Sequence, residues 1–171
     1  MAAELLVIVV LPFLLALAAG WDLASYTIPN RLQLALVAAF VVFVLATGMP
    51  HGMLGWHLLA GFLGLTAGFT LFALGFIGGG DVKLFAAIAL WLGFDRDLMN
   101  YMLIASLLGG ALTLALLVLR RVPLPARLTG QSWLLRLHDD RAGIPYGVAL
   151  AAGAFLVLPQ TEIFRLAAGG G

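Results

Sequence analysis

Long apolar runs recur from one end of this chain to the other. They cover residues 2–19, 32–47, 53–77, 82–94, 98–119 and 144–158. A helix that crosses a bilayer needs about 20 mostly apolar residues. Of the 171 residues, 63% are hydrophobic and 10% are charged. The interior of a domain of this size is too small to bury so many hydrophobic residues away from water. The sequence therefore predicts an all-α integral membrane protein, a bundle of six transmembrane helices forming a single domain over residues 1–171.

The composition also excludes several functional classes. The chain has no cysteine, so a disulfide framework, a thiolate metal site and a cysteine nucleophile are excluded. Its net charge of +1 leaves no basic field for a nucleic-acid backbone. His51, His57 and His138 lack metal-ligand spacing, and no Gly-x-Ser-x-Gly element is present. We therefore expect no nucleic-acid partner, no metal and no cofactor.

Lysine and arginine are distributed unevenly over the segments that join the apolar runs. One side of the membrane receives seven, namely Arg31, Lys83 and five arginines within residues 120–143, whereas the other receives only Arg96 and Arg165. The side with the excess is the cytoplasmic one. The N-terminus is therefore expected outside, and the connections after the first, third and fifth spans are expected in the cytoplasm.

Asp22 and Asp81 differ from the other acidic residues in their surroundings. Each lies where an apolar run meets the predicted cytoplasmic side, Asp22 shortly before Ile28-Pro29-Asn30 and Asp81 directly after Gly78-Gly79-Gly80. A carboxylate kept at membrane depth is costly and usually has a task or a partner. Two carboxylates that face each other share a proton, so one can activate a water while the other protonates a leaving amine. The pattern predicts aspartic-protease chemistry.

Both aspartates also have a purely structural interpretation. Asp22 is equally well explained as an acid at the level of the lipid headgroups, where charge costs little. Asp81 precedes an apparent helix and is a preferred N-cap residue type. The three glycines favour a functional interpretation, because they let an extended substrate approach the backbone closely.

Small residues recur at a spacing of four on two of the predicted spans. Gly64 and Gly68 form one row, and Gly143, Gly147 and Ala151 form another. Such rows let helix backbones approach each other closely in lipid. We interpret both rows as packing surfaces.

The longest polar stretch covers residues 120–143. It combines apolar and basic side chains, namely Trp133, Leu134, Leu135 and Leu137 among Arg127, Arg136 and Arg141. Such a segment could be a short amphipathic helix lying on the inner leaflet. A plain, positively charged cytoplasmic loop explains the same residues equally well.

Three motifs together resemble the type IV prepilin peptidase family, membrane aspartic proteases with a GxGD motif. Asp22 with the following Ile28-Pro29-Asn30 resembles the segment of the family's first aspartate, and Gly78-Gly79-Gly80-Asp81-Val82-Lys83-Leu84 resembles that of the second. Ile144-Pro145-Tyr146-Gly147 resembles the segment that opens the family's last helix. A lone GxGD is a weak signal, but three motifs in this order, over essentially the whole chain, are a strong one.

The resemblance implies that Asp22 and Asp81 are catalytic. It also implies residues that bind substrate or shape the loops, namely Gly78, Gly79, Gly80, Lys83, Ile28, Pro29, Asn30, Pro145 and Tyr146. The implied reaction removes the short basic leader of a prepilin-like protein, with a glycine before the cleaved bond and a hydrophobic helix after it. Cleavage would occur at the cytoplasmic edge of the cell membrane.

The chain resembles the short form of this family, associated with tight-adherence (Flp) pili, or a minimal archaeal-like enzyme. Larger members carry an extra N-terminal cytoplasmic domain, often with cysteines, that is linked to N-methylation of the mature pilin. This sequence has neither feature, so methyl transfer is not expected. Basic residues that often precede Ile-Pro-Asn in relatives are replaced here by Ala24, Ser25, Tyr26 and Thr27.

Two functions of other classes remain open at this stage. A small carrier or channel would also combine broken helices with acids at membrane depth. A subunit of a pilus-assembly machine without catalytic activity is the second alternative. The sequence indicates neither the oligomeric state nor the identity of the pilin.

Overall fold

The computed structural model describes residues 2–125, 127, 130–140 and 142–167, and this part of the chain forms helices and no strands. The first helix is continuous but contains a π-helical turn, so it comprises α1, η1 and α2. The elements are α1 (Ala2–Leu5), η1 (Leu6–Val10), α2 (Leu11–Ser25), α3 (Asn30–Thr47), α4 (His51–Ala73), α5 (Gly79–Leu92), α6 (Arg96–Arg120), α7 (Ser132–His138), α8 (Tyr146–Val157), η3 (Leu158–Gln160) and α9 (Glu162–Ala167).

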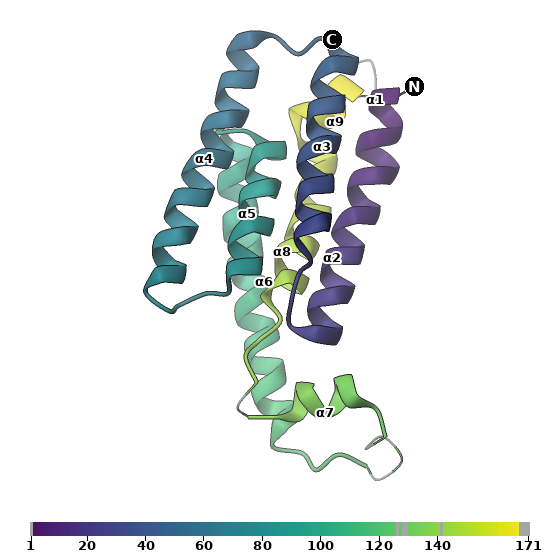
Figure 1. The fold of residues 1–171 in the computed structure, drawn as a ribbon, viewed down its shortest axis with the longest axis vertical. Coiled ribbons are helices and arrows are strands. Elements are labelled where there is room, and N and C mark those ends of the chain that lie inside the picture. The colour runs from purple at the N-terminus through teal and green to yellow at the C-terminus, as the bar shows by residue number, and fades with distance from the viewer. Residues whose placement is uncertain (1, 126, 128–129, 141, 168–171) are drawn as a thin grey trace.

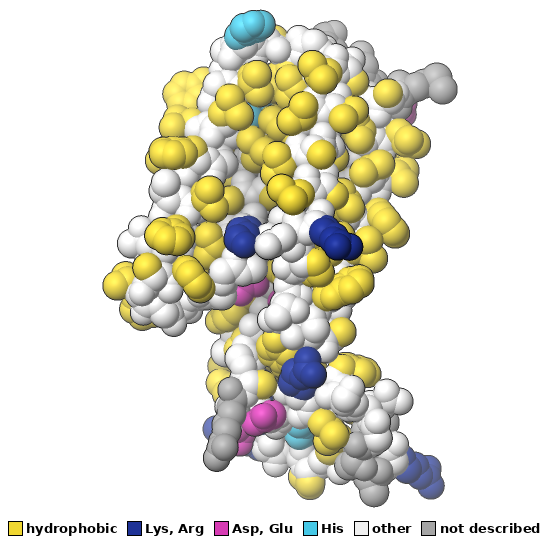
Figure 2. Space-filling model, in the orientation of Figure 1, with side chains coloured by type: hydrophobic (Ala, Val, Ile, Leu, Met, Phe, Trp, Pro, Cys, Tyr) yellow, Lys and Arg dark blue, Asp and Glu magenta, His cyan; other side chains and the backbone are white. Residues whose placement is uncertain are grey.

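The lengths and surfaces of the helices are those of a membrane protein. Within the described residues, four helices are long and apolar enough to cross a bilayer, namely Ala2–Ser25, α3, α4 and α6. The predicted count of six therefore depends on α5 and α8, which have 14 and 12 residues. Large apolar side chains cover much of the surface (Figure 2), and Leu45 is 78% and Phe62 63% exposed. Water-soluble monomers rarely expose such extensive apolar surface.

The long helices run back and forth along one axis (Figure 1). The α2–α3 connection, the α4–α5 connection and the start of α8 lie at one end of the bundle, which we call the aspartate end. The first and last helices, α1 and α9, lie near the opposite end, and α6 extends beyond the bundle toward α7. The three segments expected on one side of the membrane thus do share one end of the molecule.

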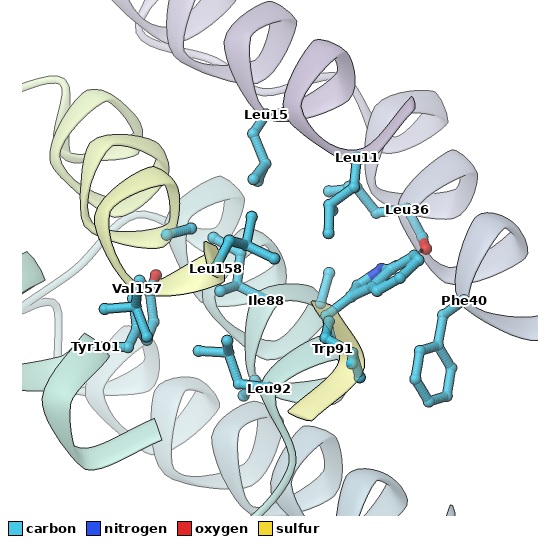
Figure 3. Close-up of a cluster of buried hydrophobic side chains, with 14 of the residues drawn as sticks. Leu11, Leu15, Leu36, Phe40, Ile88, Trp91, Leu92, Tyr101, Val157 and Leu158 are labelled. Atoms are coloured by element: carbon cyan, nitrogen blue, oxygen red, sulfur yellow. Dashed lines mark hydrogen bonds between the residues drawn. The ribbon is translucent and has the colours of Figure 1, made fainter. Parts of the chain in front are cut away.

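Helix α5 is the centre of the core (Figure 3). Its Trp91 ring lies edge-on to Phe40, with ring centroids 5.5 Å apart, and its indole Nε1 donates to the Leu36 carbonyl at 3.0 Å. Leu11 and Leu15 of α2 are buried in the same cluster. A buried tryptophan with a satisfied N–H fixes its neighbours well. The helix that carries Asp81 is therefore tied to both α2 and α3.

The first predicted row of small residues does mediate close packing. A Cβ added to Gly64 would lie 3.2 Å from Phe85 Cε1, and one added to Gly68 would lie 2.7 Å from Val82 Cγ1. Helices α4 and α5 therefore depend on glycine at their contact. The prediction for the second row is only partly confirmed. Gly143 precedes α8, and a Cβ added there would have nothing within 4 Å.

Two helix ends differ from the prediction. The first helix continues to Ser25 instead of ending near residue 19, so Asp22 is helical. Gly20 costs about 1 kcal/mol relative to alanine in a helix, which does not stop a long apolar one. Helix α4 ends at Ala73 rather than at residue 77, and the left-handed Gly75, with φ of 78°, turns the chain away.

The chain forms a further helix beyond the last predicted span, which ends at residue 158. Residues 162–167 form α9, whose Ile163 is 1% exposed and belongs to the core. Burial of one large apolar side chain is enough to hold such a short helix against the bundle. The final glycines at 169–171 lie outside the described residues.

Among the described residues between 121 and 143, one α-helix is present, α7. Arg120 Nε donates to the Leu137 carbonyl at 3.0 Å, which ties α7 to the end of α6. Trp133 and Leu135 are 40% and 46% exposed on α7. The predicted amphipathic segment does contain a helix. Its contact with the inner leaflet stays a prediction. Arg141 lies outside the described residues.

Candidate active site

Asp22 lies near the end of α2, at the aspartate end of the bundle. Its side chain is buried, at 4% exposure, and Oδ2 accepts a hydrogen bond of 2.7 Å from the backbone N–H of Gly147. The helix ends just beyond it, because Tyr26 adopts a left-handed conformation with φ of 56° and donates its N–H to the Asp22 carbonyl. Such a conformation is strained for tyrosine and often occurs next to functional sites.

Asp81 lies in the first turn of α5 and is half-buried. The N-cap of this helix is Gly78, whose carbonyl accepts from Val82 N–H at 3.1 Å, so the interpretation of Asp81 as the N-cap is wrong. A Cβ added to Gly78 would lie 3.0 Å from Asp81 Oδ2. Glycine at position 78 therefore gives the carboxylate room beside the backbone.

The two aspartates, 59 residues apart along the chain, line one cleft of about 320 Å³. We call it the aspartate cleft. Its lining residues are Asp22, Tyr26, Thr27, Ile28, Asn30, Gly78, Gly79, Gly80, Asp81 and Lys83. The Asp81 carboxylate experiences the charge of Asp22 and also interacts with the amide of Gly147 that binds Asp22.

Gly147 is the residue at which α8 contacts the carboxylate of Asp22. A Cβ added there would lie 2.8 Å from Asp22 Oδ2 and 2.8 Å from Ile28 Cδ1, closer than real Cβ atoms approach other atoms. With any larger residue, either α8 or the Asp22 carboxylate and the tip of Ile28 must shift. Glycine thus lets the backbone itself serve as the hydrogen-bond donor.

Two side-chain contacts join the start of α3 to the start of α5, the helix that carries Asp81. Lys83 Nζ donates to Asn30 Oδ1 at 2.9 Å, and Gln33 Nε2 donates to the Gly80 carbonyl at 3.0 Å. Gly80 also packs against Ile28, since an added Cβ would lie 3.4 Å from the Ile28 nitrogen. The start of α3 therefore holds the glycine turn that precedes Asp81.

Three of the residues implied by the resemblance do not line the aspartate cleft. Pro29 and Pro145 occupy the N-cap positions of α3 and α8. Tyr146 points toward α6, where its hydroxyl lies 3.2 Å from Thr113 Oγ1. In the structure these residues begin or anchor helices beside the cleft.

Three residues at the site had no role assigned from the sequence. Gly147 was part of a motif and of a small-residue row. Its hydrogen bond to Asp22 joins residues 125 positions apart, so only the three-dimensional structure reveals it. Gln33 is a polar residue inside an apolar run, a signal that the sequence did offer. Tyr26 lines the cleft, and its left-handed backbone leaves no mark in the sequence.

The arrangement suits acid–base chemistry on a substrate that enters from the aspartate end. Two carboxylates that face each other in one cleft repel each other when both are ionised, and such a pair can share a proton. A pair that holds one proton offers a base and an acid in the same cleft. Among the described residues, no group of three or more His, Asp or Glu is placed to hold a metal ion.

A model of the type IV leader peptidase family matches residues 9–114, a range that contains both aspartates and every residue lining the cleft. The chain belongs to the type IV leader peptidase family. It is 34% identical over 161 residues to the prepilin leader peptidase/N-methyltransferase of Bacillus subtilis (strain 168), a match that covers 88% of this chain and 62% of that protein. This family membership confirms the resemblance seen in the motifs. No solved structure matches the chain.

Proposed function

We propose that the protein is a membrane-embedded aspartic endopeptidase that removes the short basic leader of prepilin-like proteins. The observation that carries the proposal is the aspartate cleft, which Asp22 of α2 and Asp81 of α5 both line and in which Asp22 is bound by the amide of Gly147. Membership of the type IV leader peptidase family supports the same activity.

In the proposed reaction, one carboxylate takes a proton from a water molecule as its oxygen attacks the carbonyl carbon of the scissile peptide. The other carboxyl group donates a proton to the departing nitrogen. The C–N bond breaks, a C–O bond forms, and the products are a leader with a free carboxylate and a mature protein with a free amine. Such a pair supplies both proton transfers from this chain's own side chains.

The proposed topology has six spans, formed by α1–α2, α3, α4, α5, α6 and α8 with η3. The N-terminus is outside, and the aspartate cleft faces the cytoplasm at the inner membrane. This orientation is supported by the excess of lysine and arginine in the segments at the aspartate end. The substrate would then be cut where its leader leaves the bilayer.

Methyl transfer is left out of the proposed activity. The Bacillus subtilis relative is named for both activities, and the chain spans 62% of that relative's length. The absence of cysteine from these 171 residues supports proteolysis alone. The pilin and the oligomeric state are not part of the proposal.

The proposal is tested with purified protein in liposomes and a model prepilin. Asp22→Asn and Asp81→Asn should each lower the cleavage rate at least about 100-fold, the lower limit for a lost acid–base group. Asp97→Asn, at the opposite end of the bundle, should retain the normal rate and serves as the matched control. Thermal unfolding shows that each variant is folded. Normal cleavage by either folded cleft variant would contradict the proposal.

A further inference from the structure

A second depression, which we call the membrane groove, runs along the surface beside the aspartate cleft. Helix α5 lies between α3 and α4 (Figure 1), and the groove between these helices has a volume of about 560 Å³. Its walls include Leu34 and Val37 of α3 and Leu58 and Phe62 of α4. These side chains are 39–68% exposed, so the groove is open along its side.

The membrane groove adjoins the aspartate cleft. Asn30 and Lys83 line both, and they are joined by a hydrogen bond of 2.9 Å. From Asn30 to Val37 the groove follows α3 for seven residues, which is roughly 10 Å along a helix. The groove therefore leads from the carboxylates into the apolar part of the bundle.

Small residues also line the groove. They are Gly61 of α4 and Ala86 and Ala87 of α5, beside the larger Leu90 of α5. In lipid, small residues let a helix backbone approach closely and gain packing contacts. The shape and the apolar chemistry together suit a transmembrane helix.

One polar atom at the cleft end of the groove distinguishes a peptide from a lipid chain. Gln33 lines the groove and is 6% exposed. Its Nε2 donates to Gly80, whereas its Oε1 is buried and accepts no hydrogen bond from the described residues. An unsatisfied buried acceptor costs about 1–3 kcal/mol, so a donor is favoured there. An acyl chain has no donor to offer.

The same atom also indicates which part of a helix lies beside it. Amides inside a helix are already bonded, and free N–H groups occur in its first turn or in extended backbone. A helix that begins beside Gln33 supplies such donors, whereas the middle of a span from a second copy of this chain does not. The backbone that precedes this first turn would then lie in the aspartate cleft.

We propose that the membrane groove is the docking site for an apolar transmembrane helix of the substrate, whose N-terminal end lies at Gln33. This inference rests on the proposed peptidase function and adds how the substrate is held. Docking would fix the distance from the helix start to the cleaved bond. Substrates with that spacing would place the scissile peptide between Asp22 and Asp81.

The test compares two tryptophan substitutions on one helix. Val37 lines the groove, whereas Val41, one turn farther along α3 and 51% exposed, does not. The probe is a model prepilin with a short basic leader ending in glycine and an apolar helix of about 20 residues. Val37→Trp should raise KM at least about tenfold, the effect of losing one large packed side chain, while kcat and thermal stability stay normal. Val41→Trp should match the unmodified protein.

Disulfide mapping identifies the occupant, because the chain has no cysteine of its own. In the Asp81→Asn background, Leu34→Cys should crosslink to a cysteine in the first two turns of the probe helix. Leu103→Cys on α6, which is 61% exposed, should not. Crosslinks between two copies of the protein, or a Leu34→Cys variant that forms none, would overturn the docking proposal.

The outcome also separates this inference from the function on which it rests. If the unmodified protein cleaves the probe but Val37→Trp behaves like Val41→Trp, the groove proposal fails and the peptidase stands. If the unmodified protein does not cleave the probe, the proposed function fails.

Discussion

Asp22 and Asp81 carry the same chemical group, but the fold holds them in different ways. Asp22 belongs to a long helix, is buried, and accepts a hydrogen bond from α8, 125 residues away. Asp81 belongs to the first turn of a short helix, is half-buried, and follows a turn of three glycines that Gln33 holds. One carboxylate is fixed by the packing of distant helices, the other by one turn of backbone.

The difference shows where the site is most vulnerable. A buried carboxylate needs its hydrogen-bond partner, because an unsatisfied charged group in a dry environment is costly. The hydrogen-bond partner of Asp22 is a backbone amide. The length of this hydrogen bond therefore depends on the distance between α2 and α8. Changes that separate these helices should therefore be more harmful than changes that loosen the turn before Asp81.

The largest effect in this comparison is expected from Gly147→Ala. The added methyl group would lie 2.8 Å from both Asp22 Oδ2 and Ile28 Cδ1, so either the Asp22 carboxylate and the tip of Ile28 or the whole of α8 must shift. Overpacking of this kind costs about 1–3 kcal/mol, and the hydrogen bond to Asp22 would lengthen. We expect a lower melting temperature and a cleavage rate reduced at least about tenfold.

Gly143→Ala is the matched control for this substitution, because a Cβ at Gly143 has nothing within 4 Å. It should leave both the cleavage rate and the melting temperature unchanged. A Gly147→Ala protein with normal rate and stability would show that the α2–α8 contact does not hold Asp22.

A smaller effect is expected from Gln33→Met, which keeps an unbranched side chain but removes the donor to the Gly80 carbonyl. One such hydrogen bond contributes about 0.5–1.5 kcal/mol, so the cleavage rate should fall about two- to tenfold. Gln160→Met, at the opposite end of the bundle, should have no effect. If Gln33→Met lowered the cleavage rate as much as Gly147→Ala does, the inference that the α2–α8 contact matters more than the turn before Asp81 would be wrong.

The sequence predicted the parts of this molecule that depend on local pattern. The apolar runs correspond to the long helices, and the glycines before Asp81 do form the turn that begins α5. Both aspartates stood out because polar or glycine-rich motifs interrupt apolar runs beside them. The grouping of their connections at one end followed from alternation along the chain and from the charge count.

The remaining features depend on tertiary structure. The role of Gly147 needs the approach of α8 to α2, which no local pattern encodes. Tyr26 ends its helix in a conformation that tyrosine rarely adopts, and α9 is held by burial of Ile163. A glycine at position 20 suggested a helix end, although long apolar helices tolerate it.

The most direct test of the central claim, that the two carboxylates act as one unit, is the cleavage rate of the Asp22→Asn/Asp81→Asn double variant beside the two single variants. Residues that act together lose nearly all of their effect when the first is removed. We expect the double variant to cleave no more slowly than the slower single variant. Losses that multiply in the double variant would contradict the claim, because the two aspartates would then act independently.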